Sequence, residues 1–174
     1  MKFTIFYKQL LIFIIFSSSL VIGLYFNEDL SGGAIYDYNI HKRTIIDLFE
    51  KGIGYGLLNY DEFTNTHSPL FIIILNFLIS KNELFGRLFY ILISSSIIIV
   101  FYKSLILKYK TNSLLLFLLS NFFLLSPYFR AYSIWPGDET IALIFFCFSI
   151  YFFLKYILSA KNLTIFVILN VISL

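Results

Sequence analysis

Three carboxylates stand where this sequence passes between apolar stretches, and they are its best candidates for chemistry. Asp37 opens the segment Asp37-Tyr-Asn-Ile-His41 shortly after the first long apolar run, and Asp138-Glu139 separates two later runs. A carboxylate at the edge of an apolar environment adds little to stability but is well suited to proton transfer. The sequence therefore predicts Asp37 and Asp138 as catalytic residues, provided that both lie at the same face of the molecule.

The composition indicates a membrane protein. Apolar residues make up 59% of the chain and charged residues only 13%, too few to cover the surface of a soluble domain. The formal net charge of +3, with no basic tract, argues against a nucleic-acid partner and leaves the lipid bilayer as the expected one. The lone cysteine, Cys147, lies inside an apolar run and is expected to be a packing or lipid-facing residue.

Apolar stretches long enough to cross about 30 Å of hydrocarbon recur along the chain. We expect an all-α, polytopic membrane protein with about five transmembrane helices, near residues 9–27, 88–107, 111–129, 140–157 and 163–174. No clear Ala-x-Ala site follows the first stretch, which disfavours a cleaved signal peptide. The last stretch would rise only about 18 Å as a helix. We therefore expect the chain to be the amino-terminal part of a longer transmembrane module.

The side of the membrane on which the long loop of residues 28–87 lies follows from the lysines. Its apolar segment, Ser68 to Ser80, would rise only about 20 Å, which is short for a span. If that segment does not cross, one set of lysines shares the cytoplasmic side, as the positive-inside rule requires: Lys2, Lys8, Lys103, Lys108, Lys110, Lys155 and Lys161. The amino terminus is then cytoplasmic, and juxtamembrane helices, Asp37 and Asp138 face the extracytoplasmic side.

Residues 36–51, inside this loop, have the periodicity of an amphipathic helix. At 100° per residue the apolar and polar faces lie opposite each other: Tyr38, Ile45, Leu48 and Phe49 against Asn39, Arg43, Asp47 and Glu50. Asp37 and His41 lie one turn apart at the edge of the apolar face. An interfacial anchor would explain such a helix without any chemistry, so both interpretations stay open.

The other candidates also have structural alternatives. His67 fits a loop or capping position, and Arg130 fits a side chain that reaches toward the membrane surface. Asp138 and Glu139 fit the first turn of a helix, where carboxylates face the positive end of the helix dipole. The aromatic residues around Trp135 fit an interfacial belt.

The order of these pieces resembles the GT-C superfamily of membrane glycosyltransferases, and within it the protein O-mannosyltransferases and the lipid A aminoarabinose transferases. The resemblance rests on four segments in order: Asp37-Tyr-Asn-Ile-His41 through Leu48-Phe-Glu-Lys-Gly52, then His67-Ser-Pro-Leu70, Phe85-Gly-Arg-Leu88 and Arg130-Ala-Tyr-Ser-Ile-Trp-Pro-Gly-Asp138. The chain departs from the family where Asp37-Tyr38 replaces an Asp-Glu pair and where His-Ser-Pro replaces His-Pro-Pro.

The resemblance implies a glycosyltransferase that moves a sugar from a polyprenyl-phosphate-linked donor to an acceptor. The reaction would take place at the extracytoplasmic face of a bacterial inner or plasma membrane. Asp37 would be the general base and Asp138 the second catalytic carboxylate. The substrate-binding candidates are His41, Lys42, Arg43, His67, Arg130 and Glu139. A divalent cation, held by Asp37, Asp138 or Glu139, is the one cofactor that these carboxylates suggest.

Two other functions stay open: a subunit of a polysaccharide or lipid flippase or polymerase, and an inactive membrane fragment. A transporter usually places ionisable groups near the middle of its spans. Here the acidic residues gather between the apolar stretches instead. This distribution favours chemistry at the membrane interface.

Overall fold

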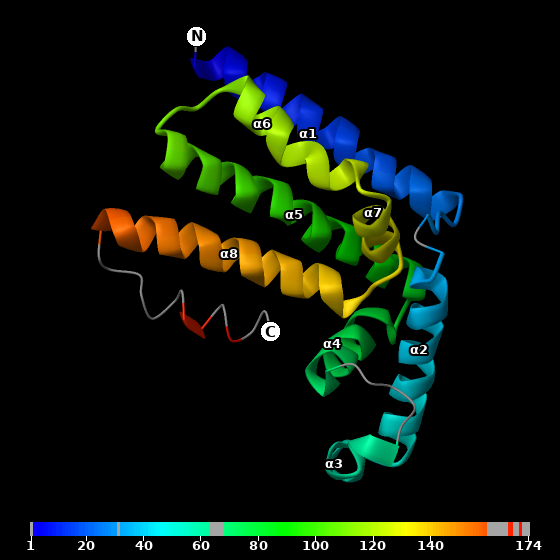
Figure 1. Cartoon of the computed structure of the whole chain (residues 1–174). Coiled ribbons are helices and arrows are strands. Elements are labelled where there is room, and N and C mark those ends of the chain that lie inside the picture. The colour runs from blue at the N-terminus through cyan, green and yellow to red at the C-terminus, as the bar shows by residue number, and fades with distance from the viewer. Residues whose placement is uncertain (1, 31, 63–67, 160–166, 169–170, 172–174) are drawn as a thin grey trace.

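The regular structure is helical throughout the described part of the chain, which in this computed structural model comprises residues 2–30, 32–62, 68–159, 167–168 and 171 (Figure 1). The helices are α1 (Lys2–Tyr25), α2 (Ala34–Glu50), α3 (Ile53–Leu58), η1 (Tyr60–Glu62), α4 (Pro69–Ile79), α5 (Glu83–Tyr109), α6 (Leu114–Ser120), η2 (Asn121–Leu125), α7 (Pro127–Ile134) and α8 (Asp138–Ser159). The predicted all-α class is thus confirmed.

Three of the described helices are long and apolar enough to cross a membrane: α1, α5 and α8. A fourth span is formed if α6–η2 and α7 together count as one bent crossing. Most of the predicted span at residues 163–174 lies outside the described residues. The described chain therefore has three or four candidate membrane spans, and the predicted count of about five stays a prediction.

The predicted span at residues 111–129 is not one continuous helix but comprises α6, η2 and the start of α7. The chain bends by 70° between Leu125 and Pro127. Ser126 has an extended backbone (φ −71°, ψ 119°), and its hydroxyl caps α7 by accepting a hydrogen bond from the Phe129 amide, with an N–O distance of 3.3 Å. Proline provides no amide for the preceding turn and disfavours a helical conformation in the residue before it. The helix therefore stops at Leu125 and restarts in a new direction.

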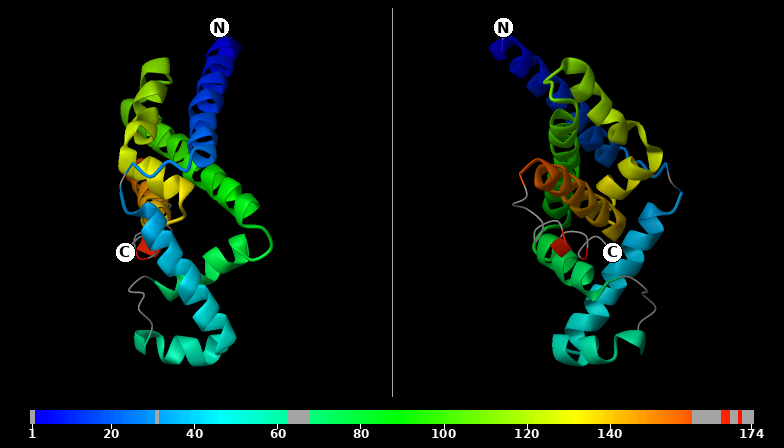
Figure 2. Two further views of the ribbon diagram at one scale, coloured as in Figure 1. Left: turned by 90° about the vertical axis from the view of Figure 1, so that its right-hand side faces the viewer. Right: turned by 60° about the vertical axis from the view of Figure 1, so that its left-hand side comes forward.

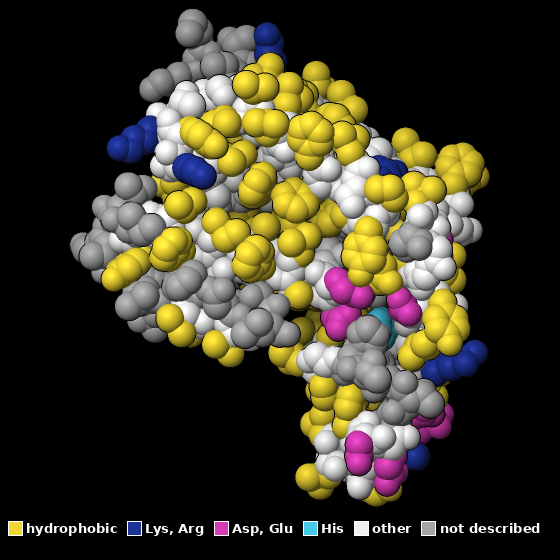
Figure 3. All heavy atoms as spheres, in the orientation of Figure 1, with side chains coloured by type: hydrophobic (Ala, Val, Ile, Leu, Met, Phe, Trp, Pro, Cys, Tyr) yellow, Lys and Arg dark blue, Asp and Glu magenta, His cyan; other side chains and the backbone are white. Residues whose placement is uncertain are grey.

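α5 is the central helix and packs against α1, α4, α6, α7 and α8. The long helices run side by side, so that the starts of α1 and α6 and the ends of α5 and α8 meet at one end of the bundle (Figure 1). α2, α3 and α4 lie beyond the opposite end in all three views (Figures 1 and 2). Acidic side chains gather on this second end, together with some Lys and Arg side chains, and other Lys and Arg side chains lie at the first end (Figure 3). Asp37 and Asp138 therefore lie at the same end of the bundle.

The predicted amphipathic helix is present as α2, which begins two residues earlier than expected. Tyr38, Ile45 and Leu48 are buried, as the periodicity predicts, whereas Phe49, expected on the same face, is exposed. Asp29 caps the helix by accepting hydrogen bonds from the amides of Ala34 and Ile35, at 3.2 and 3.4 Å. This contact sets the direction in which the chain leaves α1 and enters α2.

α4 is a short helix that folds back on the start of α5. Its 11 residues rise only about 16 Å, so it is too short to cross a bilayer by itself. Pro69 occupies its first turn, where the missing amide costs nothing. At the hairpin, an added Cβ on Gly86 would lie 2.4 Å from the carbonyl oxygen of Leu78, so only glycine permits this close packing.

Polar contacts tie α1 and the residues just after it to the rest of the bundle. Arg130 of α7 forms a bidentate ion pair with Glu28, with N–O distances of 2.6 and 2.7 Å. At the other end, the side-chain amide of Gln9 donates to the hydroxyl of Tyr102 at 2.6 Å, and this hydroxyl donates to Asn112 at the same distance. Such shielded bonds are costly to leave unmade, so they specify which helices pack together.

Candidate functional site

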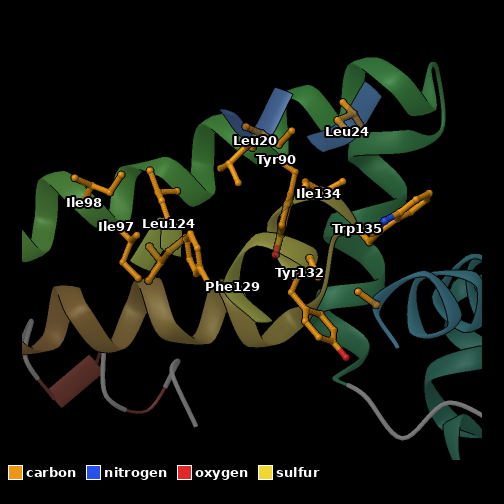
Figure 4. Packing of buried hydrophobic residues seen from close by; sticks show 14 of the residues in the cluster. Leu20, Leu24, Tyr90, Ile97, Ile98, Leu124, Phe129, Tyr132, Ile134 and Trp135 are labelled. Carbon is orange, nitrogen blue, oxygen red and sulfur yellow. The ribbon is translucent and has the colours of Figure 1, made fainter. Parts of the chain in front are cut away.

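Asp37 lies in the first turn of α2, at the end of the bundle where α7 meets α8. Its Oδ2 accepts a hydrogen bond of 2.5 Å from the hydroxyl of Tyr132 on α7. The Asp37 side chain is half-buried, whereas the Tyr132 ring belongs to the core, from which its hydroxyl projects (Figure 4). A buried tyrosine thus holds a carboxylate that solvent still reaches.

A second tyrosine connects this pair to Glu139. The rings of Tyr128 and Tyr132 lie with their centroids 4.5 Å apart, because residues four apart share a helix face. The hydroxyl of Tyr128 donates to Oε1 of Glu139 at 3.3 Å. Two carboxylates from helices far apart in sequence are therefore bound to one tyrosine pair. This arrangement is the candidate functional site.

Asp138 begins α8 beside Glu139, as expected for carboxylates at a helix amino terminus. Both acidic residues line a cavity of about 620 Å³ between α4 and α8, which we call the α4–α8 cavity. Asp138 also influences Tyr60 of η1, whose pKa is raised by burial and then by the nearby Asp138 charge. Asp138 is therefore placed close to the loop elements as well as to Glu139.

Two side chains of α5 hold the turn between α7 and α8. Arg87 donates from Nε to the carbonyl oxygen of Ile134 at 3.0 Å and stacks 3.6 Å from the ring centroid of Trp135. The hydroxyl of Tyr90 donates to the carbonyl oxygen of Gly137 at 2.5 Å. These contacts fix the backbone just before Asp138 and Glu139, and so position both carboxylates.

Gly137 is required at this turn because there is no room for a side chain. An added Cβ would lie 2.4 Å from Cδ1 of Tyr132 and 2.7 Å from Oε2 of Glu139. Contacts this short do not occur without displacement of the neighbours. The missing side chain of Gly137 therefore allows Tyr132 and Glu139 to approach each other.

The predicted ligand residues on α2 do not all face this site. His41 was expected at the edge of the apolar face, but its side chain is fully buried and packs edge-on against Phe71 of α4, with ring centroids 5.2 Å apart. The expectation of an edge position was wrong because α4 covers this side of α2. Lys42 forms an ion pair of 2.7 Å with Glu83, and Arg43 is exposed.

Arg130 was expected to bind substrate, but its guanidinium is engaged within the protein. It pairs with Glu28 and donates from Nη1 to Ser19 Oγ at 2.9 Å, so its position is set by α1. Substrate binding by Arg130 stays a prediction that would require this pair to open. His67 lies outside the described residues.

The predicted metal ligands do not assemble into a full set in the part of the chain that the structure describes. No group of three or more His, Cys, Asp or Glu side chains there is close enough to hold a metal ion. Asp37 and Glu139 contact different tyrosines rather than a common centre. The divalent cation stays a prediction, and no step below depends on it.

Tyr128, Tyr132 and Arg87 were not predicted as site residues. The two tyrosines fit the predicted aromatic belt, and their spacing of four residues places them on one face of α7, but only the structure shows that Glu139 lies beside Tyr128. Arg87 stands four residues after Glu83 in an apolar helix, where an arginine is unusual and indicates a specific partner. Its partner, the α7–α8 turn, is distant in sequence.

Comparisons with protein-family models, with curated proteins and with solved structures found no match.

Proposed function

We propose that this chain carries an interfacial glycosyl-transfer site of the GT-C type, in which Asp37 is the general base. The observation that carries the proposal is the hydrogen bond from Tyr132 to Asp37, beside the contact of Tyr128 with Glu139. It places the two acidic regions singled out in the sequence around one tyrosine pair. The proposal also rests on the ordered motif resemblance described above.

The reaction requires a base for the acceptor and a leaving group on the donor. Asp37 takes the proton from the acceptor hydroxyl, and the acceptor oxygen forms a bond to the anomeric carbon of the sugar. The bond between that carbon and the phosphate oxygen breaks, and its electron pair leaves with the polyprenyl phosphate. A carboxylate positioned in this way typically contributes about a hundredfold to ten-thousandfold in rate.

Tyr132 has a positioning role in this scheme. Its hydroxyl binds Oδ2 of Asp37, and a general base needs only one oxygen for the proton. Because Tyr132 is held by the core and by Thr140, which donates to the Tyr132 carbonyl oxygen at 3.2 Å, the carboxylate cannot swing freely. The fixed orientation lowers the entropy cost of reaching the acceptor.

The proposal assigns no stabilisation of the leaving phosphate to the cations predicted as substrate-binding residues. Arg130 is paired with Glu28, and Lys42 with Glu83. Arg43 is exposed on the polar face of α2, which the periodicity places opposite Tyr38. The proposal is therefore restricted to activation of the acceptor.

The test compares Asp37→Asn with Asp47→Asn, a substitution at an exposed position of the same helix. Transfer of radiolabelled sugar from a polyprenyl-phosphate donor is measured in membranes that contain equal amounts of each protein. Asp37→Asn should lose transfer by about a hundredfold or more, because Asn accepts no proton, and Asp47→Asn should keep it. Equal transfer by both variants would remove Asp37 as the base and leave α2 as an interfacial anchor.

A further inference from the structure

A second cavity, which Glu139 also lines, lies along α5, η2, α7 and α8. It encloses about 470 Å³, within the range of roughly 300–1,000 Å³ typical of small-molecule sites. Most of its wall is apolar: Phe101, Phe122, Phe123 and Phe129 with Leu119 and Leu143. We call it the phenylalanine cavity.

The polar groups of the phenylalanine cavity gather where α7 and α8 begin. Glu139 and Thr140 come from the first turn of α8, and Ser126 and Tyr128 from the start of α7. Phe101, in contrast, lies in the second half of α5. The cavity thus has a polar head at the acidic end of the bundle and an apolar body that extends along the candidate membrane spans.

The charge at the polar head selects among amphiphiles. Among the described residues that line the cavity, the ionisable acid is Glu139, and Asp138 precedes it on the same helix turn. A phosphate or sulfate head would be repelled here, while an ammonium head would be attracted. Tyr128, about half exposed, presents a ring next to Glu139 that can receive a cation on its face.

We propose that the phenylalanine cavity binds an amphiphile with a positively charged ammonium head, with the head at Glu139 and Tyr128 and the apolar chain along Phe101, Phe122 and Phe123. The ammonium head is inferred from charge complementarity with Glu139, and the apolar chain is inferred from the apolar wall along the remainder of the cavity. This binding does not depend on sugar transfer, and it is measured on the chain without any sugar donor.

The test uses the full chain in dodecyl maltoside micelles, with a trace of radiolabelled dodecyltrimethylammonium as the probe. Gel filtration in buffer that contains the probe measures how much label travels with the protein in excess of protein-free micelles. We expect a saturable excess for the original sequence and none for labelled dodecyl sulfate. Glu139→Gln should weaken binding on the order of tenfold, because a charged partner of the ammonium group is lost. Glu50→Gln, an exposed acid on α2, should not.

A second pair of variants tests the apolar part of the cavity. Leu143→Trp fills it, whereas Leu118→Trp adds the same bulk at an exposed position of α6 outside its lining. Only Leu143→Trp should lose the excess label, with unchanged helix content by circular dichroism. Should Glu139→Gln fail to fold, this pair decides the question. Retention of binding in Leu143→Trp, retention in folded Glu139→Gln, or equal binding of dodecyl sulfate would overturn the proposal.

Discussion

The hydroxyl of Tyr132 donates a 2.5 Å hydrogen bond to Oδ2 of Asp37, across 95 residues of sequence. This bond joins the helix after the Pro127 bend to the first turn of the amphipathic helix. It connects two regions that a membrane protein of this length could also have placed on opposite faces. The candidate site depends on this bond, because it brings Asp37 to the tyrosine pair that also contacts Glu139.

Tyr132→Phe should therefore destabilise the protein. Loss of a hydrogen bond to a charged, half-buried partner should cost about 1–2 kcal/mol of unfolding free energy. Denaturant unfolding in detergent, followed by circular dichroism, measures this cost. Tyr128→Phe is the control, since its bond to Glu139 is longer, at 3.3 Å, and its side chain is about half exposed. An equal cost for both variants would contradict the assigned importance of the Tyr132 bond.

Gly137→Ala should disturb the candidate site through the α7–α8 turn. The new Cβ would meet Tyr132 at 2.4 Å, and overpacking of this kind typically costs about 1–3 kcal/mol. Gly54→Ala in α3 provides the control, because an added Cβ there meets nothing within 4 Å. We expect Gly54→Ala to be neutral or slightly stabilising in thermal unfolding. A stable Gly137→Ala variant would show that the turn can shift without loss.

The Arg130–Glu28 pair is largely shielded from solvent and should contribute more to stability than a surface ion pair. Its side chains are 17% and 15% exposed, so Arg130→Met alone leaves a shielded carboxylate and should cost about 2–4 kcal/mol. The double variant with Glu28→Gln should cost less than the sum of the two single variants. Lys42→Met, which breaks a pair with side chains 37% and 42% exposed, should cost under about 1 kcal/mol. Additive unfolding free energies would argue against direct coupling between Arg130 and Glu28.

The proposed orientation can be measured with cysteines at exposed positions. A cysteine in place of Glu62 should react with an impermeant maleimide on intact cells, whereas one in place of Lys110 should react only after permeabilisation. The lysine distribution predicts this difference through the positive-inside rule. The native Cys147 is 3% exposed and should give little background. The reverse labelling pattern would invert the topology.

Asp138→Asn should lower the pKa of Tyr60. Burial is the larger cause of the raised pKa and would remain, so the pKa should fall only part of the way to its ordinary value of about 10. The pKa of Tyr60 is higher in the folded protein than its ordinary value. The folded state therefore gains stability from neutral Tyr60 at pH values below the ordinary pKa, and it loses this stability as the pH rises through the folded pKa. NMR of labelled tyrosine, assigned with Tyr60→Phe, follows the titration, and Glu62→Gln is the control. An unchanged Tyr60 pKa in Asp138→Asn would show that the charge of Asp138 does not reach Tyr60 of η1.

The sequence by itself determined those features that depend on local pattern. Helix length and apolar content identified α1, α5 and α8 as candidate spans, and the period of α2 predicted the burial of Tyr38, Ile45 and Leu48. Pro127 was also a local signal for a break, because a proline interrupts a helix. The long apolar run around it nevertheless led to the prediction of a span through this position.

Only the tertiary structure decided which partners meet. His41 is buried because α4 folds over α2, and Arg130 is engaged because α1 lies beside α7. Tyr132 reaches Asp37 because the α7–α8 turn is held by Arg87 and Tyr90 of α5. Periodicity shows which face of a helix is buried, but it does not show which helix covers that face. That choice depends on packing and polar pairing between segments far apart in sequence.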